Sequence, residues 1–200
     1  MMDRASAPPS GYSSSEGGAL LLTGVNLLDF DQTESAMRQV AEKLGRIDIL
    51  INAAGGFGWQ VLADGGIDLW DQMYAVNLKT AVIASKAALP HLIAAGAGRI
   101  INIGAGAAQK AAAGMGAYAA AKSGVIRLTE SLSQEVMEHG ITVNAILPGT
   151  IDTPQNRKDM PDADRRRWVS PEEIAEVAVF LASGAARAVT GAALPVLGRG

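Results

Sequence analysis

The strongest constraint on the fold is a repeating alternation of short apolar runs with longer stretches of helical periodicity. The runs IDILI (47–51), RIINIG (99–104) and ITVNAIL (141–147) are almost continuously apolar, as in strands that are covered on both faces. Helical segments separate these runs, and strands that alternate with helices form parallel sheets. We therefore expect an α/β fold, with a doubly wound parallel sheet and helices on both of its faces.

The chain before the first expected strand has a different composition. Residues 1–18 are rich in Ser, Pro and Gly and show no periodicity, so we expect a flexible leader followed by a single domain over 19–200. Within that domain, the first strand is expected over 19–27. Asp31 and Glu34 have the spacing of a capping box, which predicts the start of the next helix.

Glycine and proline positions predict where the helices end. Gly45 and Gly140 are placed to end two of them. A long helical region over about 68–95 is expected to have a kink or a boundary near Pro90, because proline removes a backbone donor. The remaining expected elements are a helix around Tyr118, a helix over 171–181 and a final strand near 192–197.

Composition excludes several classes of function. A formal net charge of −3 over 200 residues gives no reason to expect nucleic acid or an anionic membrane as partner. The chain has no cysteine, and its two histidines lie far apart in the sequence, so no metal site is expected. No apolar run reaches the roughly 20 residues of a membrane span, and no signal-peptide core is found. A cytoplasmic location is expected.

Tyr118 and Lys122 stand four residues apart in the alanine-rich stretch GAYAAAKSGV. In a helix this spacing places two side chains on one face, about 5–6 Å apart at Cβ. The lysine charge favours the phenolate, so we expect the pKa of Tyr118 to fall below about 10, which suits a proton donor and acceptor. An ordinary surface pair has the same spacing, so the surrounding turns must decide between the two interpretations.

Small residues and a Pro-Gly turn follow three of the expected strands. NAAGG follows 47–51, AGAAQK follows 99–104, and PGTIDTP follows 141–147. Short loops often need glycine for steric reasons alone. In open parallel sheets, however, ligands bind beyond the carboxyl ends of the strands. Three such turns beside the helix that carries Tyr118 predict a ligand site at this edge.

These residues resemble the short-chain dehydrogenase/reductase family over about residues 25–200. The resemblance rests on Asn52-Ala53-Ala54-Gly55, on Asn77 at the family's spacing before Tyr118, on Tyr118-x-x-x-Lys122, and on Pro148-Gly149 followed by Ile151 and Thr153. It implies a Rossmann-like fold and an NAD(P)-dependent oxidoreductase that transfers hydride to a carbonyl or quinonoid imine of a small-molecule substrate. It also implies a homodimer or homotetramer, formed through the long helices near 70–95 and 117–139.

The resemblance implies a role for each matching position. Tyr118 would donate a proton to the substrate, Lys122 would lower the pKa of the tyrosine and hold the nicotinamide ribose, and Asn77 would bind a water of the proton relay. The positions implied to hold NAD or NADP are Asn26 and Leu27 beside the adenine, Asn52, Ala53, Ala54 and Gly55 beside the adenosine half, Tyr118, Lys122, Pro148 and Gly149, and Ile151 and Thr153 at the carboxamide.

The chain departs from the family pattern at Ala105, where the family normally has a serine that polarises the substrate. In ketone reduction, the loss of such a donor would cost on the order of 10²–10³ in rate. The run LPGTIDTPQNRKDMPDADRRRW over 147–168 resembles the loop of dihydropteridine reductases, which also have Gly-Ala in place of the serine. This branch implies an electron-poor quinonoid imine as substrate and weakly favours NADH.

Several polar groups near this loop have two possible interpretations. The RRRW end of the loop is either a lid over the substrate or a charged face. The other side chains that either aid substrate binding or lie in solvent are Gln109, Lys110 and Asn156.

A second departure concerns the phosphate-binding turn. The family opens with a TGxxxGxG turn that places the pyrophosphate at a helix N-terminus. Here Thr23-Gly24 is followed by no glycine at the required places. The spacing identifies 19–27 with the third strand of the family's fold, so we expect a sheet that is N-terminally incomplete. The strand over 47–51 would then have an open edge, unless 19–27 or another chain covers it.

Two hypotheses of different classes follow. The first is a short-chain oxidoreductase whose reacting groups, Asn77, Tyr118 and Lys122, are intact. The second is a non-catalytic truncated homologue that acts as an oligomer partner, or a partial reading of a longer gene. The missing phosphate turn favours the second hypothesis, and the intact site residues favour the first.

Overall fold

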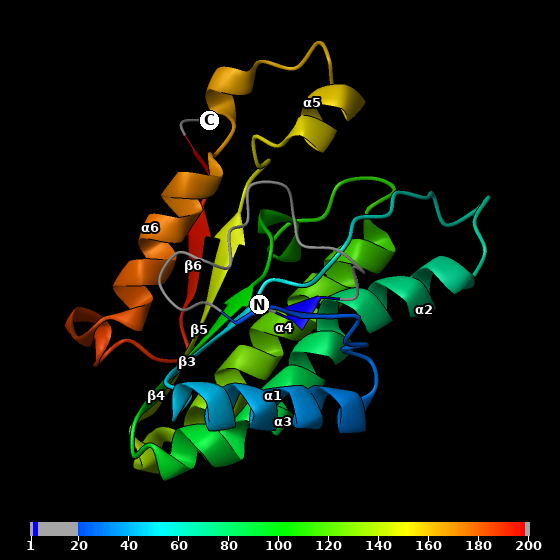
Figure 1. The fold of residues 1–200 in the computed structure, drawn as a ribbon. Coiled ribbons are helices and arrows are strands. Elements are labelled where there is room, and N and C mark those ends of the chain that lie inside the picture. The colour runs from blue at the N-terminus through cyan, green and yellow to red at the C-terminus, as the bar shows by residue number, and fades with distance from the viewer. Residues whose placement is uncertain (1, 4–19, 199–200) are drawn as a thin grey trace.

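The computed structural model describes residues 2–3 and 20–198, so nearly all of the expected leader lies outside the described residues. The strands are β1 (Met2–Asp3), β2 (Leu22–Thr23), β3 (Ile49–Asn52), β4 (Gly98–Ile103), β5 (Ile141–Pro148) and β6 (Ala193–Val196). The α-helices are α1 (Phe30–Leu44), α2 (Asp68–Tyr74), α3 (Thr80–Ala94), α4 (Gly116–Glu135), α5 (Pro154–Asp159) and α6 (Pro171–Ala182) (Figure 1). Within these described ranges, the structure has no helix with the length and apolar character needed to cross a membrane.

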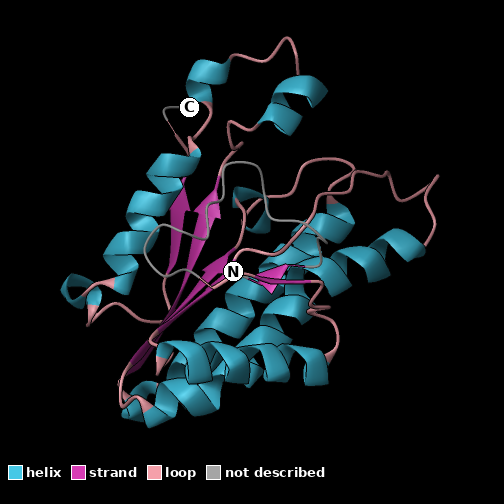
Figure 2. Cartoon of the chain, in the orientation of Figure 1, coloured by secondary structure: helices cyan, strands magenta, loops and turns pink. Residues whose placement is uncertain are grey.

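The main sheet is parallel throughout, with the strand order β3-β4-β5-β6. Figure 2 shows α6 on one side of this sheet and α1, α3 and α4 on the other. The doubly wound, Rossmann-like α/β fold is therefore confirmed. The predictions for β4, β5, β6 and α6 agree with the structure to within one or two residues.

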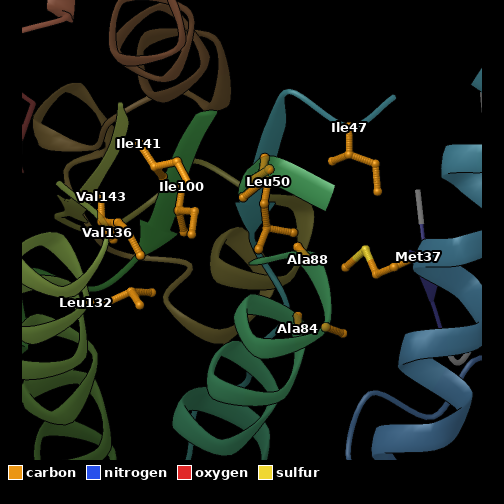
Figure 3. Close-up of a cluster of buried hydrophobic side chains, with 12 residues drawn as sticks. Met37, Ile47, Leu50, Ala84, Ala88, Ile100, Leu132, Val136, Ile141 and Val143 are labelled. Carbon is orange, nitrogen blue, oxygen red and sulfur yellow. The ribbon is translucent and has the colours of Figure 1, made fainter. Parts of the chain in front are cut away.

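The two faces of the sheet are packed by alternate residues of its strands. Leu50, Ile100 and Val143 face α1, α3 and α4, and they belong to the larger apolar cluster, part of which Figure 3 shows. Ile101 of β4 and Ile146 of β5 lie in a second cluster with residues of α6. This alternation explains the continuous apolar runs, because both faces of each inner strand are covered.

The expected strand over 19–27 is wrong in both length and place. Only Leu22–Thr23 is a strand, and it pairs with β1 outside the main sheet. The expected capping box is also wrong, because α1 is capped by Asp29 and not by Asp31. The Asp29 carboxylate accepts hydrogen bonds from the backbone N–H and the side-chain amide of Gln32, at 3.1 and 2.9 Å. The end at Gly45 is confirmed, and that residue is left-handed with φ 85°.

The long helical region is interrupted at a different place from the one predicted. Pro90 lies inside α3, which continues to Ala94. Pro90 is on the exposed side of the helix, as is Lys86, whose carbonyl group loses its donor, while Ala88 and Leu92 are fully buried. The interruption occurs instead at Ala75–Lys79, which forms a π-helical turn between α2 and α3.

Strand β3 is the edge of the sheet among the residues that the structure describes. Leu50 is buried, but Ile49 and Ile51 on the opposite face are 45% and 49% exposed. The described part of the 19–27 segment does not fill the place beside β3, because β2 pairs with β1. The open edge expected for this strand is therefore present within the described residues.

Candidate active site

The carboxyl ends of β3, β4 and β5 bring most of the predicted site residues to one edge of the sheet. The turns that follow these strands begin at Ala53, Gly104 and Gly149. Helix α4 carries Tyr118 and Lys122 in its first two turns, and it packs against β5 and α2. Parallel strands place these turns together because their carboxyl ends share one edge.

Lys122 is a buried cation at this edge. Its side chain is 5% exposed, and its Nζ donates a hydrogen bond to the carbonyl oxygen of Ile103, at the end of β4, at 2.8 Å. Burial lowers the pKa of Lys122 to about 8, because desolvation disfavours the charged form. The ammonium is therefore held by the sheet itself.

Tyr118 is half-buried, and its ring lies between an aromatic side chain and the lysine. Phe57 meets it edge-on, with ring centroids 5.1 Å apart, and Lys122 Nζ lies 6.0 Å from the ring centre. The expected fall in the pKa of Tyr118 is wrong for this chain, since burial raises that pKa. Lys122 Nζ donates its hydrogen bond to Ile103, and desolvation of the phenol affects the pKa of Tyr118 more than the lysine charge does.

Asn77 lies in the π-helical turn and is 2% exposed. Its Oδ1 accepts a hydrogen bond from the N–H of Gly56 at 3.1 Å, and its Nδ2 donates to the carbonyl oxygens of Gly56 and Met73 at 3.0 and 3.1 Å. The side-chain amide of Asn77 therefore holds the loop after β3 in place.

Gly55 is the point at which these groups come together. A Cβ on this residue would lie 2.7 Å from Asn77 Oδ1 and 3.3 Å from Lys122 Nζ. Any larger side chain would thus push apart the asparagine and the lysine. The structure brings together Gly55, Asn77, Tyr118 and Lys122, as the sequence predicts.

Asn52 takes part in a chain of hydrogen bonds below the site. Its Nδ2 donates to Asn102 Oδ1 at 2.8 Å and to Ser85 Oγ at 3.1 Å. Asn102 lies opposite Asn52 in the parallel register and in turn donates to Thr129 of α4 at 2.8 Å. These bonds tie β3 and β4 to the helix of Tyr118.

A groove of about 440 Å³ runs beside the open edge of β3. Its walls include Leu27, Asn52, Ala53 and Ala54, all of which are predicted to border the adenosine half of a cofactor. Ile49 and Ile51 make part of the same wall apolar. Asn26 is not part of the lining, and its Oδ1 accepts a hydrogen bond from the N–H of Leu28 at 3.2 Å.

The residues after β5 form a folded loop with its own hydrogen bonds. Gly149 donates its N–H to Val196 at 2.9 Å, and a Cβ on it would lie 3.1 Å from the carbonyl oxygen of Leu197. Ile151 pairs with Val169 across the loop. The Thr153 hydroxyl caps α5 by accepting a hydrogen bond from the backbone N–H of Asn156 at 3.1 Å.

The polar groups with two interpretations lie mostly in solvent. Gln109, Lys110 and Arg165–Arg167 are exposed. Asn156 is half-buried, and its Nδ2 donates to the carbonyl oxygen of Ile151 at 2.8 Å. That side chain stabilises the loop, and Ala105 is buried with no polar group to offer.

Aromatic residues of the loop after β3 are the site neighbours that the sequence reasoning missed. Phe57 contacts Tyr118, and Trp59 Nε1 donates to the carbonyl oxygen of Ala113 at 2.9 Å. The signal was present in GGFGWQ, where two large aromatic side chains stand in an otherwise glycine-rich loop.

The described residues fit the nicotinamide half of a dinucleotide better than its pyrophosphate. Gly55 packs against Asn77 Oδ1 and Lys122 Nζ, and Lys122 and Tyr118 lie beside it at the same edge of the sheet. Thr23 ends β2, which lies outside the main sheet, and Gly24 follows it. This pair therefore does not stand between a strand of the main sheet and the helix that follows that strand.

Comparisons with known proteins identify the family of this chain. The family model described as short chain dehydrogenase matches residues 9–164. The chain belongs to the short-chain dehydrogenase family. Members of this family use NAD or NADP, act on small molecules and are commonly oligomeric.

Named relatives are reductases and dehydrogenases. A 3-oxoacyl-(acyl-carrier-protein) reductase of Vibrio harveyi is 36% identical over 207 residues, which covers 94% of this chain and 84% of the relative. A meso-2,3-butanediol dehydrogenase of Serratia marcescens is 33% identical over 189 residues, covering 90% and 75%. Carveol dehydrogenase from Mycobacterium avium, in complex with NAD, matches with a TM-score of 0.80 and 32% identity over 88% of this chain and 73% of that one. The chain is thus related to short-chain oxidoreductases in both sequence and fold.

Proposed function

We propose that this chain transfers a hydride between NAD or NADP and a carbonyl or quinonoid imine carbon of a small molecule, with Tyr118 as the proton donor. The observation that carries the proposal is the convergence of Tyr118, Lys122 and Asn77 around Gly55 at the carboxyl edge of the sheet. A surface pair would leave the lysine in solvent. Here the lysine is buried, although burial of its charge is unfavourable, and a site that needs the charge explains that cost.

The chain's own residues would bind and orient the cofactor, whose nicotinamide supplies the hydride when it is bound. Lys122 and Tyr118 would hold the ribose, and Ile151 and Thr153 the carboxamide. The positions that would border the rest of the cofactor are Asn26, Leu27, Asn52, Ala53, Ala54, Gly55, Pro148 and Gly149. The groove beside β3 supports the adenosine end of this placement, because four of these residues line it.

In this proposal the phenol of Tyr118 transfers the proton. Because burial raises its pKa, the phenol carries its proton at neutral pH and starts as an acid. The ammonium of Lys122 lies close enough to stabilise the phenolate that forms when the proton leaves. The relay water expected at Asn77 would use atoms other than its side-chain amide, which is bonded to Gly56 and Met73.

For the substrate we propose the quinonoid imine of the dihydropteridine reductase branch, with NADH as the favoured cofactor. Two features support this choice: the methyl group of Ala105 where a serine hydroxyl would polarise a ketone, and the loop over 147–168. A 3-oxo thioester is the second candidate. It is favoured by the name of the relative from Vibrio harveyi, which also covers most of this chain.

Cofactor titration tests the proposal directly. We expect saturable enhancement of nicotinamide fluorescence with NADH or NADPH, and oxidation of the bound cofactor by a quinonoid dihydropterin faster than by acetoacetyl coenzyme A. If neither cofactor binds saturably, the enzyme proposal fails, and the non-catalytic homologue takes its place.

Assembly and location complete the proposal. We propose a homodimer or homotetramer of the cytoplasm, formed through the long helices α3 and α4. Light scattering during size-exclusion chromatography measures the mass, and a monomer at micromolar concentration would contradict the proposed assembly.

A further inference from the structure

Two loops from different parts of the chain are fastened to each other beside Tyr118. The first follows β3 and covers residues 53–67; the second, residues 112–115, leads into α4. Trp59 Nε1 donates a hydrogen bond to the carbonyl oxygen of Ala113 at 2.9 Å. The next residue, Gln60, donates its backbone N–H to the carbonyl oxygen of Gly114 at 2.8 Å. Adjacent residues of one loop therefore bind adjacent residues of the other.

The indole of Trp59 also contacts the second loop at Gly114. Gly114 has φ +76°, and a Cβ built on it would collide with the indole ring. Glycine is thus needed at this position for two reasons: its positive φ and its close contact with the indole ring. The indole is nevertheless 60% exposed, so burial of apolar area is a small part of its role. The side chain instead contributes the hydrogen bond to Ala113 and the close contact with Gly114.

Both loops lead directly to the ring of Tyr118. The second loop ends where α4 begins, at Gly116, and Ala119 in the first turn bonds to the carbonyl oxygen of Met115 at 2.8 Å. The first loop carries Phe57, whose ring meets that of Tyr118 edge-on. The contact between the loops therefore fixes both the start of the helix that carries Tyr118 and the ring of Phe57 that packs against it.

We propose that Trp59 is a positioning residue, which fastens the two loops and thereby holds Tyr118 against Phe57 in one orientation. Its effect on turnover rests on the proposed function, but its effect on the position of Tyr118 does not. A small displacement of a reacting group is enough to slow chemistry substantially, so the fastening matters although Trp59 itself lies away from the phenol.

The test compares Trp59→Phe with Trp70→Phe in the full chain. The first variant keeps a ring on Gly114 and loses the N–H donor. The second changes the other indole that touches the start of α4, at Gly116, and that makes no hydrogen bond within the described residues. Two readouts are needed: amide hydrogen exchange at Gln60, and titration of Tyr118 followed by ¹³C NMR of labelled tyrosine, with the signal assigned from Tyr118→Phe.

Trp59→Phe is expected to speed exchange at Gln60 by roughly three- to tenfold, the effect of losing one hydrogen bond. The same variant should lower the pKa of Tyr118 toward its ordinary value, because a loosened cover admits water. Trp70→Phe should change neither quantity. Unchanged exchange and titration in Trp59→Phe, or equal changes in both variants, would overturn the proposal.

Turnover separates this inference from the proposed function. With NADH and a quinonoid dihydropterin, Trp59→Phe should lower kcat by roughly three- to tenfold and leave the KM for NADH unchanged. A wild-type chain without turnover would refute the proposed function, while the exchange and titration results would still decide the role of Trp59.

Discussion

The ammonium of Lys122 is bound to the carbonyl oxygen of Ile103, 2.8 Å away, so the lysine beside Tyr118 is anchored to the end of β4. This bond joins α4, which carries Tyr118, to the sheet edge where the ligand site is proposed. The position of the charge is therefore set by the backbone of the sheet, and the phenol is placed relative to it by α4.

Folding stability should rise with pH in a window set by Lys122. Its pKa is about 8 in the folded chain and 10.5 ordinarily, so between these values the unfolded chain binds the proton more tightly. The free energy of unfolding should increase by up to about 1.4 kcal/mol per pH unit from pH 8 to 9.5, where the phenol of Tyr118 is protonated in both states. Urea unfolding of wild type and Lys122→Met measures this slope. Equal slopes in the two proteins would contradict the expectation.

Tyr118→Phe should abolish turnover and leave the fold intact. The phenyl ring keeps the edge-on contact with Phe57, and only the hydroxyl group, the proposed proton donor, is lost. We expect kcat to fall by about 10²–10⁴, the usual contribution of a general acid, with cofactor affinity changed far less. Tyr74→Phe, at an exposed tyrosine of α2, is the matched control and should keep wild-type kcat. Residual activity above a tenth of wild type would assign the proton to another group.

Asn77→Ala should destabilise the loop after β3. The substitution removes a buried side-chain amide, since Asn77 is 2% exposed, and with it the partner of the Gly56 N–H and carbonyl groups. We expect a loss of about 1–3 kcal/mol in the free energy of unfolding. Asn156→Ala removes a half-buried amide that bonds to Ile151, and it should cost less than about 1 kcal/mol. Urea unfolding ranks the two variants, and the reverse order would show that the Asn77 bonds are not structural.

Gly55→Ala should separate the groups of the site. The new Cβ would lie 2.7 Å from Asn77 Oδ1, so the asparagine or the loop must move. Overpacking of this kind costs about 1–3 kcal/mol, and saturable cofactor binding should be weakened. Gly184→Ala meets no atom within 4 Å and should stay within about 0.5 kcal/mol of wild type. Calorimetry and nicotinamide fluorescence give the two readouts, and unaltered binding in Gly55→Ala would remove this residue from the proposed site.

Ala105→Ser restores the hydroxyl that the family pattern has at this position. If a ketone is a poor substrate because this donor is absent, its kcat should rise by about tenfold or more, while reduction of a quinonoid imine should change by less than about twofold. Ala107→Ser in the adjacent short helix is the control, and steady-state kinetics with both substrates is the measurement. An equal rise for both substrates would show that the missing serine does not reflect the substrate class.

Prediction from the sequence worked where one local pattern controls the structure. The apolar runs around Leu50, Ile100 and Val143 become parallel strands because their neighbours in sequence alternate between two covered faces. It failed at Asp31 and at Pro90, where two local patterns compete. Asp29 caps the helix because its carboxylate reaches Gln32, and Pro90 is tolerated because it faces water.

For the site, the sequence by itself determined that Tyr118 and Lys122 share one helical face at the carboxyl edge of the sheet, since their spacing and the direction of parallel strands are local properties. Only the tertiary structure decided the electrostatics. Burial raises the pKa of the phenol, and the lysine bonds to Ile103, because both effects depend on groups that are distant in sequence. The contact of Trp59 with Ala113 is of the same kind, since it depends on how two loops meet, and no spacing along the chain predicts that meeting.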